Sequence, residues 1–170
     1  REVDCTLCKQ GRYQDEPGQT SMACKKCAVG RYGDVIGLVS LADCIICPKG
    51  FAQNKVGRQE CDSCFAGKYN NKVEQPECTV CPSGQSGPTR GLTVCPDCAA
   101  GFYRGELPAF ACTGCGAGKF GAGTKQTDEA VACRDCQAGK FSSKVYNVDS
   151  NFVDRIVFHA CKDCPRGFYS

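Results

Sequence analysis

Apolar and polar residues follow no helical period of useful length between the cysteines of this chain. Stretches such as QDEPGQTSMA (14–23) and NKVGRQE (54–60) mix charges with the residues that form turns. Short paired strands fit these stretches better, for example 67–69 leading through a turn near 70–71 back toward Cys78. The pattern therefore predicts a small, mostly irregular fold with short β-hairpins.

A repeat of four elements organises the whole chain. Every cysteine belongs to a C-x-x-C pair, and a glycine stands three residues after the second cysteine of each pair. Two residues after that glycine, seven of nine positions are aromatic, with Ala52 and Ser86 as the exceptions. The nine pairs are Cys5/Cys8, Cys24/Cys27, Cys44/Cys47, Cys61/Cys64, Cys78/Cys81, Cys95/Cys98, Cys112/Cys115, Cys133/Cys136 and Cys161/Cys164. Repetition this regular predicts a tandem array.

Each repeated element has a physical role. The glycine is expected to provide a turn with positive φ, or to let another part of the backbone approach closely. The aromatic is the largest apolar group of each repeat, and we expect its face to lie over a disulfide sulfur. We divide the chain into modules at 5–24, 24–44, 44–61, 61–78, 78–95, 95–112, 112–133, 133–161 and an incomplete 161–170. Modules that touch only their neighbours would form one continuous, elongated rod-like array.

Composition requires a covalent or metallic scaffold. The chain has 18 cysteines in 170 residues and no tryptophan. Leu, Ile, Val and Phe together make up less than a fifth of it, too little apolar surface to offset the ordering of the chain. The net charge of +3, with both signs interspersed, predicts no nucleic-acid partner. No apolar run approaches the ~18 residues of a membrane span, so we expect no direct membrane insertion.

Three uses of C-x-x-C are open from the residues alone. Paired motifs can supply four thiolates to zinc, although nine pairs leave one unused and His159 is isolated. A redox site needs one such motif at a helix N-terminus, which nine copies without helices do not resemble. Structural disulfides are favoured, so no cofactor, metal or catalytic residue is expected.

The economical disulfide scheme joins the second cysteine of one pair to the first of the next. Each bond would close a small loop and so raise the free energy of unfolding by roughly 3 kcal/mol. Sequence alone does not prove connectivity. Cys5 and Cys164 are then left over, and we expect them to pair with residues outside this segment. The predicted bonds are Cys8–Cys24, Cys27–Cys44, Cys47–Cys61, Cys64–Cys78, Cys81–Cys95, Cys98–Cys112, Cys115–Cys133 and Cys136–Cys161.

Residues 24–51 (CKKCAVGRYGDVIGLVSLADCIICPKGF) and 61–84 (CDSCFAGKYNNKVEQPECTVCPSG) resemble the ephrin-receptor-like cysteine-rich repeat. This repeat is related in pattern to the first module of tumour necrosis factor receptor cysteine-rich domains. The resemblance covers essentially the whole chain and implies the same pairing of cysteines. It also implies a large secreted or cell-surface protein, of a kind frequent in unicellular algae and protists.

The last interval between cysteines is the one irregular place. Residues 144–160 (KVYNVDSNFVDRIVFHA) form the most apolar stretch of the chain. It is either a loop folded back on its own module or a contact patch for a partner, since a thin array has little core in which to bury these groups. The candidate contact residues are Tyr146, Val148, Phe152, Ile156 and Phe158.

These observations favour a non-enzymatic extracellular protein. The leading hypothesis is a structural or adhesive rod, a subunit or segment of a surface filament or appendage. The alternative is an ectodomain stalk, or a ligand-binding region, of a cell-surface receptor or surface antigen. Expected partners are proteins, through self-assembly or other extracellular proteins. No Asn-x-Ser/Thr acceptor is present, so no N-linked glycan is expected, whereas Ser and Thr can carry O-linked sugars.

Overall fold

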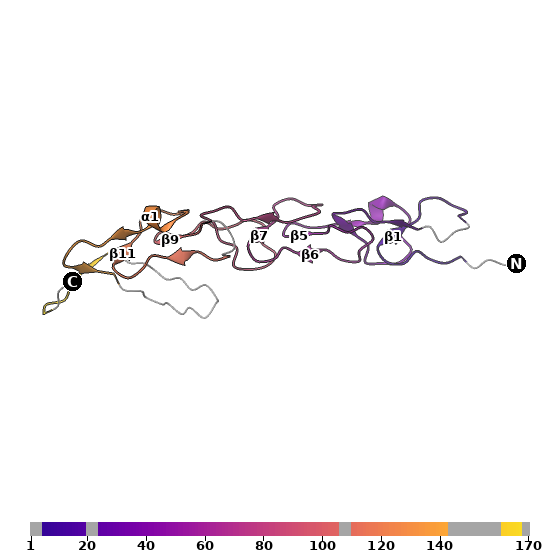
Figure 1. The fold of residues 1–170 in the computed structure, drawn as a ribbon. Helices are drawn as coiled ribbons and strands as arrows, with labels where there is room; N and C mark the ends of the chain where they lie inside the picture. Colours follow the sequence, from indigo (N-terminus) through magenta and orange to yellow (C-terminus); the bar gives the residue numbers. More distant parts are fainter. Residues whose placement is uncertain (1–4, 20–23, 106–109, 143–160, 168–170) are drawn as a thin grey trace. The chain divides into compact units, whose positions relative to one another are not determined.

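Regular structure in this protein consists of very short elements. The computed structural model describes residues 5–19, 24–105, 110–142 and 161–167. Within them, fourteen strands of two residues each form seven antiparallel hairpins, accompanied by two short helical turns (Figure 1). The prediction of a small disulfide-rich fold built from short hairpins in tandem modules is confirmed.

The seven hairpins repeat one arrangement. The first strand follows the repeated glycine, and the second strand is formed by the two residues inside the next C-x-x-C motif. The pairs are β1 (Arg12–Tyr13) with β2 (Lys25–Lys26), β3 (Arg31–Tyr32) with β4 (Ile45–Ile46), β5 (Phe51–Ala52) with β6 (Asp62–Ser63), β7 (Lys68–Tyr69) with β8 (Thr79–Val80), β9 (Phe102–Tyr103) with β10 (Thr113–Gly114), β11 (Lys119–Phe120) with β12 (Arg134–Asp135), and β13 (Lys140–Phe141) with β14 (Lys162–Asp163).

The return strand differs in place from the one predicted for residues 67–78. The first strand is β7, as expected, but its partner β8 lies after Cys78 and not before it. A backbone hydrogen bond of the repeat accounts for this register. In the first hairpin the Cys27 N–H donates to the Gly11 carbonyl at 2.9 Å, which sets Lys25–Lys26 opposite Arg12–Tyr13.

Proline explains why one repeat lacks a full hairpin. The motif Cys95–Cys98 contains Pro96, which has no N–H to donate to a ladder. Here Ser86 N–H still donates to the Pro96 carbonyl at 2.8 Å, and the pairing is reduced to a single bridge between Gln85 and Asp97.

The two helical turns occupy extra residues in the longer repeats. The bonded cysteines of four of the eight disulfides are 14 residues apart in sequence, against 17 for Cys27–Cys44 and 18 for Cys115–Cys133. The 3-10 turn η1 (Leu41–Asp43) lies in the first of these and α1 (Glu129–Ala132) in the second. Asp128 caps α1 by accepting the Val131 N–H at 3.0 Å.

Eight disulfides close the loops of the chain. Each joins the second cysteine of one C-x-x-C pair to the first of the next, with Cα–Cα distances of 5.6–5.8 Å. We number the loops in order: loop 1 (Cys8–Cys24), loop 2 (Cys27–Cys44), loop 3 (Cys47–Cys61), loop 4 (Cys64–Cys78), loop 5 (Cys81–Cys95), loop 6 (Cys98–Cys112), loop 7 (Cys115–Cys133) and loop 8 (Cys136–Cys161).

The buried apolar interior is built mainly from cystine. Apart from half-cystines, the buried apolar residues of the described part are Tyr13, Ala52 and Ala132. Tyr13 packs with the cystine of loop 2, and Tyr103 packs against a cluster that contains the cystine of loop 7. In these two repeats the aromatic thus packs in a cluster with the cystine of the following loop. That its ring face lies over the sulfur stays a prediction.

The chain divides into two compact units. Unit 1 contains residues 1–80 together with 89–94, and unit 2 contains 81–88 together with 95–170. Residues 89–94 of loop 5 therefore belong to unit 1, whereas residues 81–88 and Cys95 of that loop belong to unit 2.

Replacing Cys47 and Cys61 together by serine should lower the free energy of unfolding of the surrounding loops by about 3 kcal/mol, because a closed loop of this length restricts the unfolded chain. Chemical denaturation of the otherwise disulfide-intact protein measures this loss. A loss below about 1 kcal/mol would contradict a fold that depends on its disulfides.

Candidate functional site: contacts between disulfide loops

Two residues of each loop control how it meets other loops. The turn glycine, three residues after the second cysteine, has positive φ in all nine repeats, as predicted. In six of these repeats a second residue with positive φ lies seven positions further on, and we call it the loop tip. The described tips are Gly18, Gly37, Gly57, Glu74, Gly91 and Lys125, in loops 1, 2, 3, 4, 5 and 7.

The N–H of every described tip except Gly18 bonds to the preceding loop. It donates to the carbonyl of the cysteine that opens that loop, at 2.8–2.9 Å. Gly57 of loop 3, for instance, donates to Cys27 at the start of loop 2. The other tips with this bond are Gly37, Glu74, Gly91 and Lys125, which donate to Cys8, Cys47, Cys64 and Cys98.

The carbonyl oxygen of a tip contacts the loop that lies two positions earlier in the chain. A Cβ added to the turn glycine Gly11 of loop 1 would lie less than 3.0 Å from the carbonyl oxygen of Gly57. The same relation joins Gly30 to Glu74 and Gly50 to Gly91 in unit 1, and Gly84 to Lys125 in unit 2. The expectation that a module touches only its neighbours is therefore wrong. The repeat is compact enough for a tip to cross the neighbouring loop and rest on the next one.

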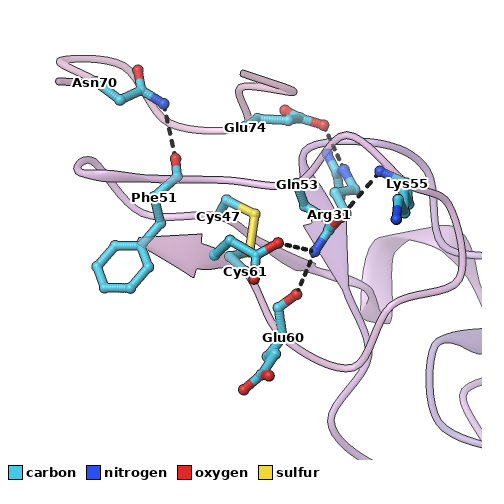
Figure 2. The surroundings of a disulfide bond; sticks show 10 residues. Arg31, Cys47, Phe51, Gln53, Lys55, Glu60, Cys61, Asn70 and Glu74 are labelled. Carbon is cyan, nitrogen blue, oxygen red and sulfur yellow. Dashed lines mark hydrogen bonds and ion pairs between the residues drawn. A yellow bond between two sulfur atoms is a disulfide. The ribbon is translucent and has the colours of Figure 1, made fainter. Parts of the chain in front are cut away.

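Two tips are not glycine, and both carry a side chain that forms an ion pair. Glu74 has φ of 58° and Lys125 has φ of 57°, a left-handed conformation that costs a non-glycine residue roughly 1–2 kcal/mol. The Glu74 carboxylate accepts from Arg31 of loop 2, and the Lys125 ammonium lies 3.6 Å from Asp97. Figure 2 shows the Arg31–Glu74 pair beside the disulfide of loop 3. The tip side chain thus reinforces the contact that its carbonyl makes.

In three of the loops a buried polar side chain occupies the position three residues after the turn glycine. Gln53 and Asn70 occupy this position in loops 3 and 4, and both are buried. The Asn70 amide donates to the Phe51 carbonyl of loop 3 at 2.8 Å, and the Gln53 amide donates to the Glu60 carbonyl at 2.9 Å (Figure 2). Their side-chain oxygens each accept the N–H two residues further along. Every buried polar atom of these two amides has a hydrogen-bond partner, so their burial leaves no polar group unsatisfied.

Arg104 fills the same position in loop 6 and is only 2% exposed. Its guanidinium donates to three carbonyl oxygens of loop 5, those of Cys81, Pro82 and Gln85. Its own carbonyl accepts the N–H of the turn glycine Gly84 at 2.8 Å. One side chain therefore ties the turn of loop 5 to loop 6 within unit 2.

Surface ion pairs shift a few pKa values. Hydrogen bonds to Asp15 and Glu16 raise the pKa of Lys25, and the Lys25 hydrogen bond lowers the pKa of Asp15. The Asp15 contribution to stability is present above its unfolded pKa and lost as pH falls through the folded value. The Lys25 contribution is present below its unfolded pKa and lost as pH rises through the folded value. Both groups are exposed, so water screens the pair and its effect on folding is small.

The predicted site residues lie as follows. The disulfides join the same cysteines as the predicted scheme, and Cys5 and Cys164 form no disulfide within this chain. Their pairing with residues outside the segment stays a prediction. The predicted contact residues Tyr146, Val148, Phe152, Ile156 and Phe158 lie outside the described residues, as does His159. Within residues 5–19, 24–105, 110–142 and 161–167, no group of three His, Cys, Asp or Glu side chains is placed to hold a metal ion. No helix in the same part of the chain is both long and apolar enough to span a membrane.

Comparison with known protein families supports the resemblance seen in the cysteine pattern. Residues 1–44, which contain loop 1 and loop 2, match the family model described as tyrosine-protein kinase ephrin type A/B receptor-like. The array is consistent with ephrin-receptor-like cysteine-rich repeats. No curated protein matches the chain. The match and the disulfides together indicate an extracellular or cell-surface region of receptor-like or structural type.

The loop tips and the buried amides were not predicted from the sequence. A signal for the tips was present, because Gly18, Gly37, Gly57 and Gly91 all stand seven residues after a turn glycine. Glu74 and Lys125 interrupt that pattern. The position three residues after the turn glycine holds Gly, Gln, Asn, Arg or Ser in the different repeats, so no single residue type reveals it.

Substituting alanine for Gly30 should destabilise its surroundings by about 3 kcal/mol, because the new Cβ collides with the Glu74 carbonyl and also requires positive φ. Gly118 is the matched control: it has similar φ, and no described atom lies within 4 Å of a Cβ built on it. Gly118→Ala should cost only about 1 kcal/mol. Native-state hydrogen exchange measures the two losses of stability. The reporters are the Cys47 amide, which donates to the Gly30 carbonyl, and the Cys136 amide, which donates to the Gly118 carbonyl. Equal losses would rule out the tip contact.

Arg104→Met should cost at least about 2 kcal/mol, since three carbonyl oxygens lose a charged donor in a buried site. Exchange of the Gly84 amide, which bonds to the Arg104 carbonyl, measures this loss. Arg58→Met is the control, because the Arg58 side chain is exposed and makes no hydrogen bond or ion pair with the described residues. It should stay within about 0.5 kcal/mol of the parent. Similar effects of the two substitutions would contradict the bonding role of Arg104.

Proposed function

We propose that this chain is a non-enzymatic region of an extracellular structural or adhesive protein. The observation that carries the proposal is that each loop is closed by a disulfide and that most described tips also rest on a loop two positions earlier. Such an arrangement keeps its shape with very little aliphatic core and depends on an oxidising environment. The match of residues 1–44 to a receptor-like repeat favours the same setting.

The finer form of the proposal is a self-assembling subunit or segment of a surface filament or appendage. Exposed aliphatic residues in the described part support contacts with other proteins, since Val35, Ile36 and Val39 in loop 2 are all more than half exposed. The apolar stretch 144–160 remains the predicted contact patch on sequence grounds.

The alternative is an ectodomain stalk or ligand-binding region of a cell-surface receptor or surface antigen. The family match is the observation that favours it, because the matching description is that of a receptor. A stalk has no need to associate with itself, whereas a filament subunit does. Self-association of the isolated chain therefore separates the two functions.

Static light scattering of the oxidised chain across a range of concentrations should show reversible association. Deleting residues 146–157 should weaken it at least tenfold, because most of the apolar patch is removed. This deletion brings the cysteine separation of loop 8 from 25 to 13, close to the 14 of loops 3–6, so the loop still closes.

Two outcomes would count against the proposal. A monomer at every concentration would exclude the self-assembling subunit and favour the stalk. Association that the deletion leaves unchanged would exclude the patch as the contact. A variant in which the same residues are replaced by a Gly/Ser segment of equal length controls for loop length.

A further inference from the structure

A surface groove of about 260 Å³ lies in unit 1, between the hairpin β5–β6 and the two ends of loop 4. Ala52, Pro76 and the cystine of loop 4 form its apolar part, together with the ring of Phe65. The polar groups around this apolar part come from Asn54, Asp62, Ser63, Lys68 and Glu77. The groove is smaller than the ~300–1,000 Å³ of pockets that enclose a drug-sized ligand, so it suits one ring of a larger molecule.

The aromatic side of this groove is open to solvent. Phe65 is 61% exposed, although leaving a Phe side chain in water is unfavourable compared with burying it. The guanidinium of Arg90 lies 4.3 Å from the ring centroid and covers one face. The exposure that remains leaves room for a ligand to pack on the ring.

The polar groups of the groove have few partners of their own. Among the described residues, the side chains of Asn54, Ser63, Lys68 and Glu77 make no hydrogen bond or ion pair. Asp62 accepts only a long bond of 3.4 Å from the Gln53 amide. The site thus offers both donors and acceptors to a ligand.

Charge around the groove is balanced. The carboxylates of Asp62 and Glu77 are matched by the cations of Lys68 and Arg90. A site with no net charge gives no electrostatic advantage to a polyanion or to a basic peptide. It favours a neutral ligand with many hydroxyl groups, each of which donates and accepts.

We propose that this groove binds one pyranose ring of a neutral glycan. The C–H face of the ring packs on Phe65, and its hydroxyls bond to Asn54, Asp62 and Glu77. This inference rests on the proposed function for the extracellular setting. It deepens that function by naming the class of ligand that an adhesive protein of this kind would bind. The hairpin β5–β6 and the two ends of loop 4 supply the site.

The test is an NMR titration of the full oxidised chain with the methyl glycosides of glucose, galactose, mannose and N-acetylglucosamine. At least one sugar should shift the amides of Ser63, Phe65 and Lys68 saturably at millimolar concentrations. Phe65→Ala should weaken that binding at least fivefold, and Glu77→Gln at least threefold. Phe110→Ala is the matched control, because Phe110 is 51% exposed and lies outside the groove, and it should leave binding within twofold.

Three results would overturn the proposal. The first is the absence of saturable shifts with all four sugars. The second is binding that Phe65→Ala leaves unchanged. The third is binding limited to a sulfated oligosaccharide or a lysine-rich peptide and lost on raising the salt concentration, which would indicate charge recognition instead. A failure here leaves the light-scattering result untouched, so it is distinguishable from a failure of the proposed function.

Discussion

The fold depends on one close approach, in which the carbonyl of a loop tip rests on the bare Cα of a turn glycine two loops earlier. The turn glycine is needed twice over, for its positive φ and for the absence of a Cβ. The tip N–H meanwhile bonds to the intervening loop. Each such tip therefore links three successive loops, and a nearest-neighbour account of the array underestimates its cooperativity.

This contact explains how the fold is stable although the chain has few aliphatic and aromatic residues. The cystines bury the sulfur-rich interior, and the turn glycines of loops 1–6 are themselves buried. Polar side chains such as Asn70 and Arg104 enter the same interior and bond to carbonyls of the preceding loop. Backbone and side-chain hydrogen bonds thus supply part of the stabilisation that an aliphatic core gives other proteins. The disulfides supply the rest, and they require an oxidising environment.

Much of this could be predicted from sequence, for a physical reason. Cysteine spacing constrains which loops can close, and the repeated glycine predicts a turn, so the hairpin modules followed from local pattern. The tip contact could not be predicted, because it joins residues more than forty positions apart, such as Gly30 and Glu74, and depends on how tightly loops pack. The groove beside Phe65 was missed for the same reason, since its walls come from two loops. The patch at residues 144–160 stays a prediction.

Amide hydrogen exchange of the tips tests the central claim most directly. The amides of Gly57, Glu74, Gly91 and Lys125 should be strongly protected, because each donates to a cysteine carbonyl of the preceding loop. Gly18, a tip with similar φ whose N–H has no acceptor among the described residues, should exchange rapidly. Exchange of the four amides at the rate of Gly18 would show that the tips are not docked, and the account would fail.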